Sequence, residues 1–260
     1  MKLIVSKENV GFLTASYVRD QIKAFNPTAD KPFIIAFPTG GTAVDMYKYL
    51  VQFHKEGTLS FDNVISFNLD EYVALPVTHP ESYHSFMWRN LFSHINMPKE
   101  HINILDGNAK DLDLECKKYE EKIASLGGIN LFLGGVGQNG HIAFNEPNSP
   151  FDTLTHVVTL TENTRQANVR FFDDDINQVP TKALSMGLGT VMSAKQVVIM
   201  ATGDKKAEAL KHAFAKGTDL NWPITILQEH NNAFIVADKE AVSQIDDDTR
   251  KTYEVCCFKK

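Results

Sequence analysis

The organisation of the chain is decided by one segment, Ile129-Asn130-Leu131-Phe132-Leu133-Gly134-Gly135-Val136-Gly137-Gln138-Asn139-Gly140-His141-Ile142-Ala143-Phe144-Asn145-Glu146-Pro147. Its first five residues form an apolar run that predicts a buried strand. Four glycines follow within seven residues, and glycine lets the backbone approach a ligand closely. A histidine and a glutamate come next, five residues apart. A strand that ends in such a loop is typical of an active site.

Strand-like and helix-like patterns alternate along the whole chain, with no repeat and no linker. Strands are expected at 2–5, 33–38, 64–68, 129–133, 156–160, 183–186, 197–201, 224–227 and 233–236, and helices at 10–25, 42–54, 82–95, 112–126, 163–172 and 205–215. This alternation predicts an α/β fold, one Rossmann-like domain over residues 1–260 with an open, mostly parallel sheet and helices on both faces.

Ligands of such sheets bind at the carboxyl ends of the strands. Polar, acidic or Gly-rich tails follow four of the expected strands, at 39–42, 70–72, 134–146 and 203–206. We therefore expect these four tails to meet at one edge of the sheet.

Composition excludes several classes of protein. The 260 residues are 43% hydrophobic and 22% charged, which is ordinary for a soluble globular protein. The net charge of -6 disfavours nucleic acid and anionic membranes as partners. The three cysteines form no Cys-x-x-Cys pair, and no apolar run reaches the length of a signal peptide core or a membrane span. We expect a cytoplasmic protein.

The turn Thr39-Gly40-Gly41-Thr42 is a candidate phosphate site. It opens an expected helix, whose free N–H groups and positive dipole end suit an anion. Thr42 and Asp45 have the spacing of a capping box, which predicts that the helix begins where the turn ends. Arg170 and Lys206 could add positive charge. The alternatives are a plain strand-to-helix turn and two solvated surface cations.

Candidate groups for proton transfer are Asp70, His141 and Glu146. A carboxylate at a buried strand end can have a raised pKa and act as a base, although Asp70 also fits a helix cap or a turn. An imidazole moves protons near neutral pH, and a carboxylate can fix its tautomer. No nucleophile-elbow pattern and no zinc signature accompany them, so acyl transfer and metal binding are disfavoured. Glu71 is expected to be structural.

Five motifs in order resemble the glucosamine-6-phosphate deaminase family, within the wider 6-phosphogluconolactonase superfamily. They are Phe37–Thr42, Phe67–Tyr72, His79–Tyr83, Gly134–Pro147 and Asn168–Phe172. The resemblance implies that the substrate is a small sugar phosphate. It implies conversion of glucosamine 6-phosphate and water into fructose 6-phosphate and ammonium, in the catabolism of N-acetylglucosamine and sialic acid, without a cofactor.

The resemblance also implies roles for single residues. His141 would open the sugar ring and Glu146 would orient it, while Asp70 would move a proton between C1 and C2. The phosphate would bind to Thr39–Thr42 with Arg170 and Lys206. Residues 156–182 would form a mobile lid.

The sequence departs from the family pattern in two respects. Asn139 stands where many members have an aspartate, so it can orient His141 but cannot stabilise an imidazolium by charge. His156 and Val158 stand where members activated by N-acetylglucosamine 6-phosphate carry a basic pair, so we expect no such activation. Hexamer, smaller oligomer and monomer stay open.

Two other functions fit parts of the sequence. A lactonase acting on a sugar-phosphate lactone would use His141 but would not need Asp70. A sugar-phosphate-sensing domain without catalysis would need a DNA-binding extension, and no basic segment could supply one.

Overall fold

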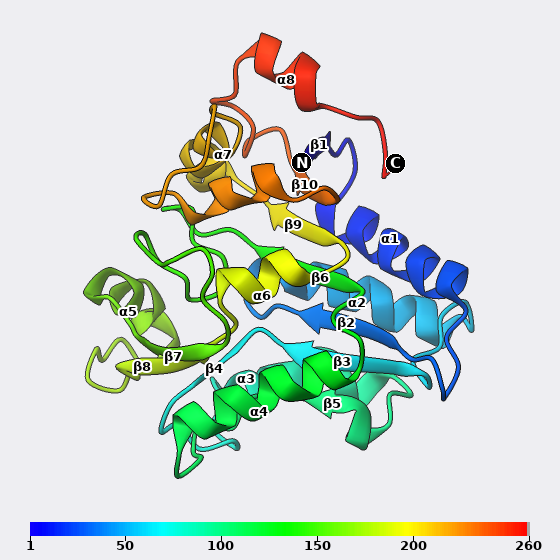
Figure 1. Cartoon of the computed structure of the whole chain (residues 1–260), viewed down its shortest axis with the longest axis vertical. Helices are drawn as coiled ribbons and strands as arrows, with labels where there is room; N and C mark the ends of the chain where they lie inside the picture. The colour runs from blue at the N-terminus through cyan, green and yellow to red at the C-terminus, as the bar shows by residue number, and fades with distance from the viewer. Residues whose placement is uncertain (259–260) are drawn as a thin grey trace.

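A parallel sheet of seven strands forms the centre of the molecule (Figure 1). The computed structural model describes residues 1–258, with the side chains of Asn163 and Ala167 excepted. In chain order the strands are β1 (Lys2–Val5), β2 (Phe33–Phe37), β3 (Val64–Asn68), β5 (Ile102–Asn103), β6 (Leu131–Gly135), β9 (Val197–Ala201) and β10 (Ala233–Ala237). Their spatial order is β1-β10-β9-β6-β2-β3-β5, and every neighbouring pair is parallel. The expected fold class is confirmed.

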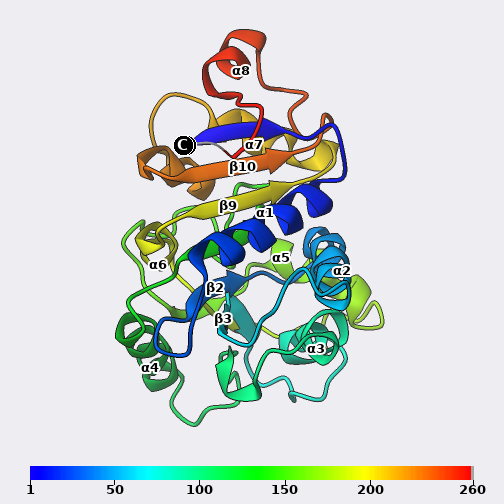
Figure 2. The ribbon, with the colours of Figure 1, turned by 90° about the vertical axis from the view of Figure 1, so that its right-hand side faces the viewer.

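Helices cover both faces of this sheet (Figure 2). One face carries α1 (Val10–Phe25), α2 (Gly41–Lys55) and α3 (Tyr83–Asn90), and the other carries α4 (Leu112–Ser125), α6 (Leu188–Ser193) and α7 (Ala207–Ala213). Two further helices are α5 (Glu162–Asn168) and α8 (Asp247–Tyr253). Short 3₁₀ turns are η1 (Phe92–His94), η2 (Lys99–His101), η3 (Val169–Phe171), η4 (Asp204–Lys206) and η5 (Pro223–Glu229). No helix within residues 1–258 has both the length and the hydrophobicity that crossing a bilayer requires.

Side-chain alternation in β2 explains the three layers. All five residues of β2 are buried. Phe33, Ile35 and Phe37 join the cluster under α1, α2 and α3, whereas Ile34 and Ala36 join the cluster under α4, α6 and α7. Successive side chains of a strand point to opposite faces, so a continuous apolar run is what a sheet covered on both sides requires.

A second, smaller sheet was not expected from the sequence. It consists of β4 (Asp70–Tyr72), β8 (Lys182–Ser185) and β7 (His156–Thr159), in the order β4-β8-β7, and both pairs are antiparallel. Because β4 begins two residues after β3 ends, this sheet lies at the carboxyl edge of the main sheet. Two predicted strands, 156–160 and 183–186, therefore exist but belong to a different sheet.

Two local predictions are wrong. Residues 224–227 are not a strand but part of η5, which has Pro223 in its first turn. The predicted capping box at Thr42 and Asp45 does not form, because Gly40 is the N-cap of α2 without a side-chain cap. The Asp45 carboxylate instead accepts hydrogen bonds from Asn9 (3.4 Å) and Lys48 (2.9 Å).

Candidate active site

The four polar strand tails do meet at one edge of the main sheet. Strands β2, β3, β6 and β9 are parallel members of it, so their carboxyl ends face the same way. The hydroxyl of Thr42, after β2, lies 3.5 Å from the hydroxyl of Thr202, after β9. The expected convergence is thus present, and the segments from the small sheet complete it.

The loop of residues 136–147, called the catalytic loop below, is fixed to β8. The backbone N–H of Phe144 donates to the Ser185 hydroxyl (3.0 Å), and the Asn145 amide donates to the Met186 carbonyl (2.7 Å). Ser185 also pairs in register with Asp70 of β4. The small sheet therefore places the loop and the strand of Asp70 relative to each other.

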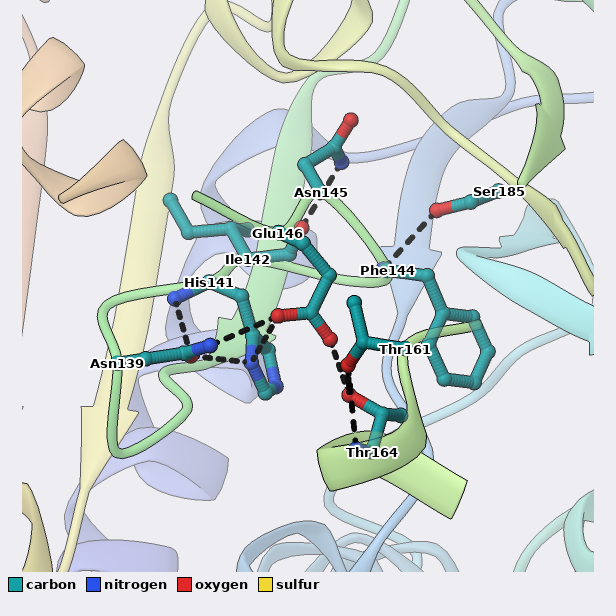
Figure 3. Close-up of polar contacts among 9 residues, drawn as sticks. All are labelled: Asn139, His141, Ile142, Phe144, Asn145, Glu146, Thr161, Thr164 and Ser185. Carbon is teal, nitrogen blue, oxygen red and sulfur yellow. Dashed lines mark hydrogen bonds and ion pairs between the residues drawn. The ribbon is translucent and has the colours of Figure 1, made fainter. Parts of the chain in front are cut away.

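Three side chains of the catalytic loop form a hydrogen-bonded chain, which we call the proton relay (Figure 3). The Asn139 amide nitrogen donates to Glu146 Oε2 (2.7 Å), since a carboxylate only accepts. This leaves Asn139 Oδ1 facing His141 Nδ1 at 2.7 Å. An amide oxygen accepts only, so Nδ1 must carry the hydrogen and Nε2 of a neutral imidazole keeps a free lone pair. His141 is thereby set up as a base at Nε2.

Glu146 does not touch the imidazole directly. Its Oε2 lies 4.0 Å from His141 Nδ1, whereas the amide of Asn139 fills the gap between them. Asn139, which departs from the family pattern, is thus the central link of the relay. Glu146 acts on His141 through Asn139 and through its charge.

Burial lowers the pKa of His141, and this is the largest effect on it. The Glu146 charge opposes the shift and the Lys206 charge adds to it. A lowered pKa keeps the imidazole neutral and able to accept a proton near neutral pH. The side chain is 31% exposed, so a ligand can reach it.

Gly137 lies directly behind the imidazole. A Cβ atom at this position would come within 2.1 Å of the ring of His141. No side chain other than hydrogen fits there while the ring keeps its place. The glycine thus sets the position of the ring.

Asp70 is a buried carboxyl group, 7% exposed, at the start of β4. Burial raises its pKa to about 8, and the charge of Glu71 adds to the shift. Among the described residues its Oδ1 has no hydrogen-bond partner. An unpaired buried carboxyl group is costly, and such groups are concentrated at functional sites.

Glu71, next to Asp70, has a structural role, as predicted. Its carboxylate accepts the backbone N–H groups of Tyr72 (2.8 Å), Tyr83 (2.9 Å) and His84 (2.9 Å). Two of these belong to the first turn of α3, whose N–H groups have no partner within the helix. Glu71 therefore anchors α3 to β4.

The turn Thr39–Thr42 has the open geometry of an anion site. Gly40 has φ +96, in the region that favours glycine, and a Cβ at Gly40 or Gly41 would meet no atom within 4 Å. Space is therefore open beside both glycines at the N-terminus of α2, the end of a helix that favours anions. The half-buried Lys206 is close enough for its charge to affect His141, and burial, followed by the charge of Lys205, lowers the pKa of this lysine.

Arg170 is not brought to this turn by any contact within the described chain. It lies exposed in η3, and its guanidinium is 4.7 Å from the ring centroid of Phe171. Its predicted role in phosphate binding stays a prediction. The described residues also contain no group of three or more His, Cys, Asp or Glu side chains that could hold a metal ion.

Sequence reasoning missed two side chains that touch the site, Ser185 and Thr164. Ser185 holds the catalytic loop, and the Thr164 hydroxyl of α5 donates to Glu146 Oε1. Both are single hydroxyl groups in ordinary surroundings, and no motif marks them. Only the packing of distant segments reveals them.

A family model described as glucosamine-6-phosphate isomerases/6-phosphogluconolactonase matches residues 7–236. A glucosamine-6-phosphate deaminase from Borreliella afzelii is 51% identical over 247 residues, which cover 94% of this chain and 92% of the relative. A glucosamine-6-phosphate deaminase from Bacteroides thetaiotaomicron is 53% identical with the same two coverages.

Solved structures give the same result. A monomeric glucosamine-6-phosphate deaminase matches with a TM-score of 0.89 and 38% identity, over 94% of this chain and 100% of that one. The 6-phosphogluconolactonase of Thermotoga maritima matches with a TM-score of 0.71 and 17% identity, over 92% and 99% of the two chains. At that identity the second likeness shows a shared fold alone.

Proposed function

The chain belongs to the family of glucosamine-6-phosphate isomerases and 6-phosphogluconolactonases, and on this basis we propose the reaction of its site. The protein is an enzyme that converts glucosamine 6-phosphate and water into fructose 6-phosphate and ammonium, a step of amino-sugar catabolism. Relatives that are 51% and 53% identical in sequence carry the name glucosamine-6-phosphate deaminase. The observation that carries the reaction is a buried carboxyl group with a raised pKa, Asp70, on a strand paired with Ser185, the residue that holds the loop of the His141 relay.

Ring opening is the task of His141. Its free Nε2 takes the proton from the O1 hydroxyl of the cyclic sugar and returns it to the ring oxygen O5, which releases the C1 aldehyde. Asn139 keeps Nδ1 protonated throughout, so that Nε2 is the nitrogen that exchanges the proton. The Glu146 charge stabilises the imidazolium that forms in between.

Isomerisation is the task of Asp70. The carboxylate takes the proton from C2 of the open chain while a proton of the C2 ammonium group passes to O1, which gives a neutral enolamine. Asp70 then returns its proton to C1. Water then adds to the resulting C2 imine, and ammonia leaves to give the ketone of fructose 6-phosphate. Asp70 must be ionised to begin, and the positive ammonium group on C2 of the substrate favours that charged form.

Binding of the phosphate is the task of Thr39–Thr42, with Lys206 and Arg170 as cations. The N-terminus of the 15-residue helix α2 opens onto this turn, and Lys206 ends η4, which follows β9 and Thr202, whose hydroxyl lies 3.5 Å from that of Thr42. Arg170 would have to leave the ring of Phe171 to reach the phosphate, which fits a segment 156–182 that closes over the substrate. Because this substrate is a phosphorylated metabolite, we place the enzyme in the cytoplasm.

A coupled assay that measures the release of ammonia from glucosamine 6-phosphate by the purified protein tests the proposal. We expect ammonia and fructose 6-phosphate in equal amounts, and little hydrolysis of 6-phosphogluconolactone. Hydrolysis of the lactone without release of ammonia would instead identify a lactonase. N-acetylglucosamine 6-phosphate should not activate the reaction, since His156 and Val158 provide no basic pair. A sigmoidal dependence of the rate on substrate concentration that this compound abolishes would contradict that expectation.

A further inference from the structure

The proton relay is joined to α5 by one hydroxyl group. Thr164 Oγ1 donates to Glu146 Oε1, while the other oxygen of the same carboxylate accepts from Asn139 at 2.7 Å (Figure 3). Each carboxylate oxygen thus has a donor from a different segment. Among the described side chains of α5, Thr164 is the one that forms a hydrogen bond with the catalytic loop.

The direction of this hydrogen-bond chain is fixed by its chemistry. The Thr164 hydroxyl has one hydrogen, and a carboxylate can only accept it. Thr164 Oγ1 must therefore accept the hydroxyl hydrogen of Thr161, 3.1 Å away. Thr161 is also the N-cap of α5, and its oxygen accepts the backbone N–H of Thr164 (3.2 Å). Hydrogen bonds in such a chain polarise and strengthen one another.

The Glu146 carboxylate depends on its two donors, Thr164 and Asn139, for its position. Glu146 is 9% exposed, and its other described polar contacts are the 4.0 Å approach to His141 Nδ1 and backbone hydrogen bonds with Phe144 and Ser149. With α5 in place, Thr164 donates to one oxygen of the carboxylate and Asn139 to the other. Without Thr164, one oxygen of a nearly buried carboxylate would lack a donor, which favours rotation of the side chain.

We propose that Thr164 is a positioning residue that couples the seating of α5 to the alignment of the proton relay. When α5 lies on the site, Thr164 holds Glu146, Glu146 holds the amide of Asn139, and Asn139 orients His141. When α5 moves away, the hydrogen bond from Thr164 to Glu146 is lost, and His141 is less well oriented. Closure of the segment and readiness for ring opening are then one event. This inference rests on the proposed function, because it assigns the relay a catalytic task.

Substitutions that separate the hydroxyl from the methyl group test this role. Thr164→Val removes the donor at nearly constant volume, and Thr164→Ala removes donor and methyl, whereas Thr164→Ser keeps the donor. In the full-length protein we expect Thr164→Val and Thr164→Ala to lower kcat about tenfold or more, with a smaller change in KM. The reason is that a hydrogen bond to a charged group is lost. Ser should stay within about threefold of the natural protein.

The matched control is Thr181→Val, which changes an exposed threonine of the same 156–182 segment and should leave kcat within about twofold. Equal activity of Thr164→Val and the natural protein would overturn the proposal, as would a Ser variant as impaired as Val.

A double-mutant cycle with Glu146→Gln separates positioning from mere support of α5. If Thr164 acts through Glu146, adding Thr164→Val to Glu146→Gln lowers kcat by less than about twofold. Independent, multiplicative losses would show that Thr164 acts elsewhere and would overturn the proposal.

A readout without catalysis is hydrogen exchange of the catalytic loop. Its amides should exchange faster in Thr164→Val and Thr164→Ala than in Thr164→Ser, and unchanged exchange would contradict the inference. Absence of ammonia release by the natural protein would contradict the proposed function alone, so the two failures are distinguishable.

Discussion

The two sheets of this protein differ in what their side chains do. The central strands β2, β9 and β10 of the large sheet are buried along their full length by apolar residues, and their polar groups come after they end. In the small sheet, β4 buries two carboxyl groups within three residues, and β7 is half-buried to exposed. The large sheet supplies stability, while the small sheet arranges the chemical groups.

This difference has an energetic cause. Burying apolar surface stabilises a fold by about 25 cal/mol per Å², whereas burying an unpaired carboxyl group is unfavourable. Asp70 is therefore tolerated because the large sheet provides the stability that β4 gives up. Substitutions in the two sheets should consequently change different properties of the protein.

The largest expected effect is that of Asp70→Asn. Loss of the base should lower kcat about 10³-fold, within the range of general acid–base catalysis. The same change should raise the melting temperature at pH 8 by roughly several degrees. Asp70 has a pKa of about 8 in the folded protein and an ordinary value of 3.8, so folding stability falls as pH rises between these values. The asparagine avoids this loss, and the gain should vanish below about pH 4.

Steady-state kinetics and thermal melts at pH 4, 6 and 8 measure both parts. A variant that is inactive but no more stable at pH 8 than the natural protein would contradict the account of Asp70 as an unfavourably buried carboxyl group.

Gly137→Ala should have the next largest effect. Its Cβ would overlap the ring of His141, so the imidazole must move away from Asn139, and kcat should fall about 100-fold. The matched control is Gly135→Ala, because a Cβ there meets only the Met200 carbonyl oxygen at 4.0 Å. Equal kcat values for the two variants would show that the position of the ring is not limiting.

A matched pair from the two sheets gives the most direct comparison. Ser185→Ala in β8 leaves the N–H of Phe144 without its partner and should lower kcat about tenfold, at a stability cost of roughly 1–3 kcal/mol. Leu131→Ala in β6 removes a side chain that is 1% exposed and should cost about 2–5 kcal/mol with kcat nearly unchanged. Chemical denaturation and kinetics at a temperature where both are folded measure the two properties. The same pattern of loss in both variants would remove the distinction between the sheets.

The smallest expected effect is that of Asn139→Asp. A carboxylate 2.7 Å from His141 Nδ1 favours the imidazolium and should raise the pKa of His141, against the lowering effects of burial and of Lys206. The acidic limb of the kcat profile should move to higher pH by about one unit, limited because Glu146 repels the new charge. Activity should be retained. An unchanged profile would count against a role of position 139 in ring opening.

The sequence was a reliable guide where a local pattern carries the information. The apolar runs of β2, β3 and β9, and the periodicity of α1 and α4, predicted those elements to within a few residues. Parallel strands end at one edge, so the meeting of the four polar tails followed from the order of the elements alone. The residues themselves predicted His141 and Glu146 as candidates for proton transfer, and the family resemblance added Asn139.

The wrong predictions from the sequence have physical reasons. Ile224, Ile226 and Leu227 fill the core from a 3₁₀ turn, and a short, largely apolar run does not distinguish such a turn from a strand. The strand β4 is polar and only three residues long, so no alternation marks it. Thr42 and Asp45 had the right spacing for a cap, but Gly40 already ends the turn.

By itself, the sequence determined the parallel sheet and the edge at which the polar strand tails meet, because these depend on local hydrophobicity and strand order. It also predicted Asp70, His141 and Glu146 as candidate groups for proton transfer, because that prediction depends on residue type. Only the tertiary structure decided that Asn139 lies between His141 and Glu146, that Ser185 holds their loop, and that Thr164 reaches Glu146 from α5. Each of these contacts depends on where a side chain points. Such directions are set by the packing of segments distant in the chain.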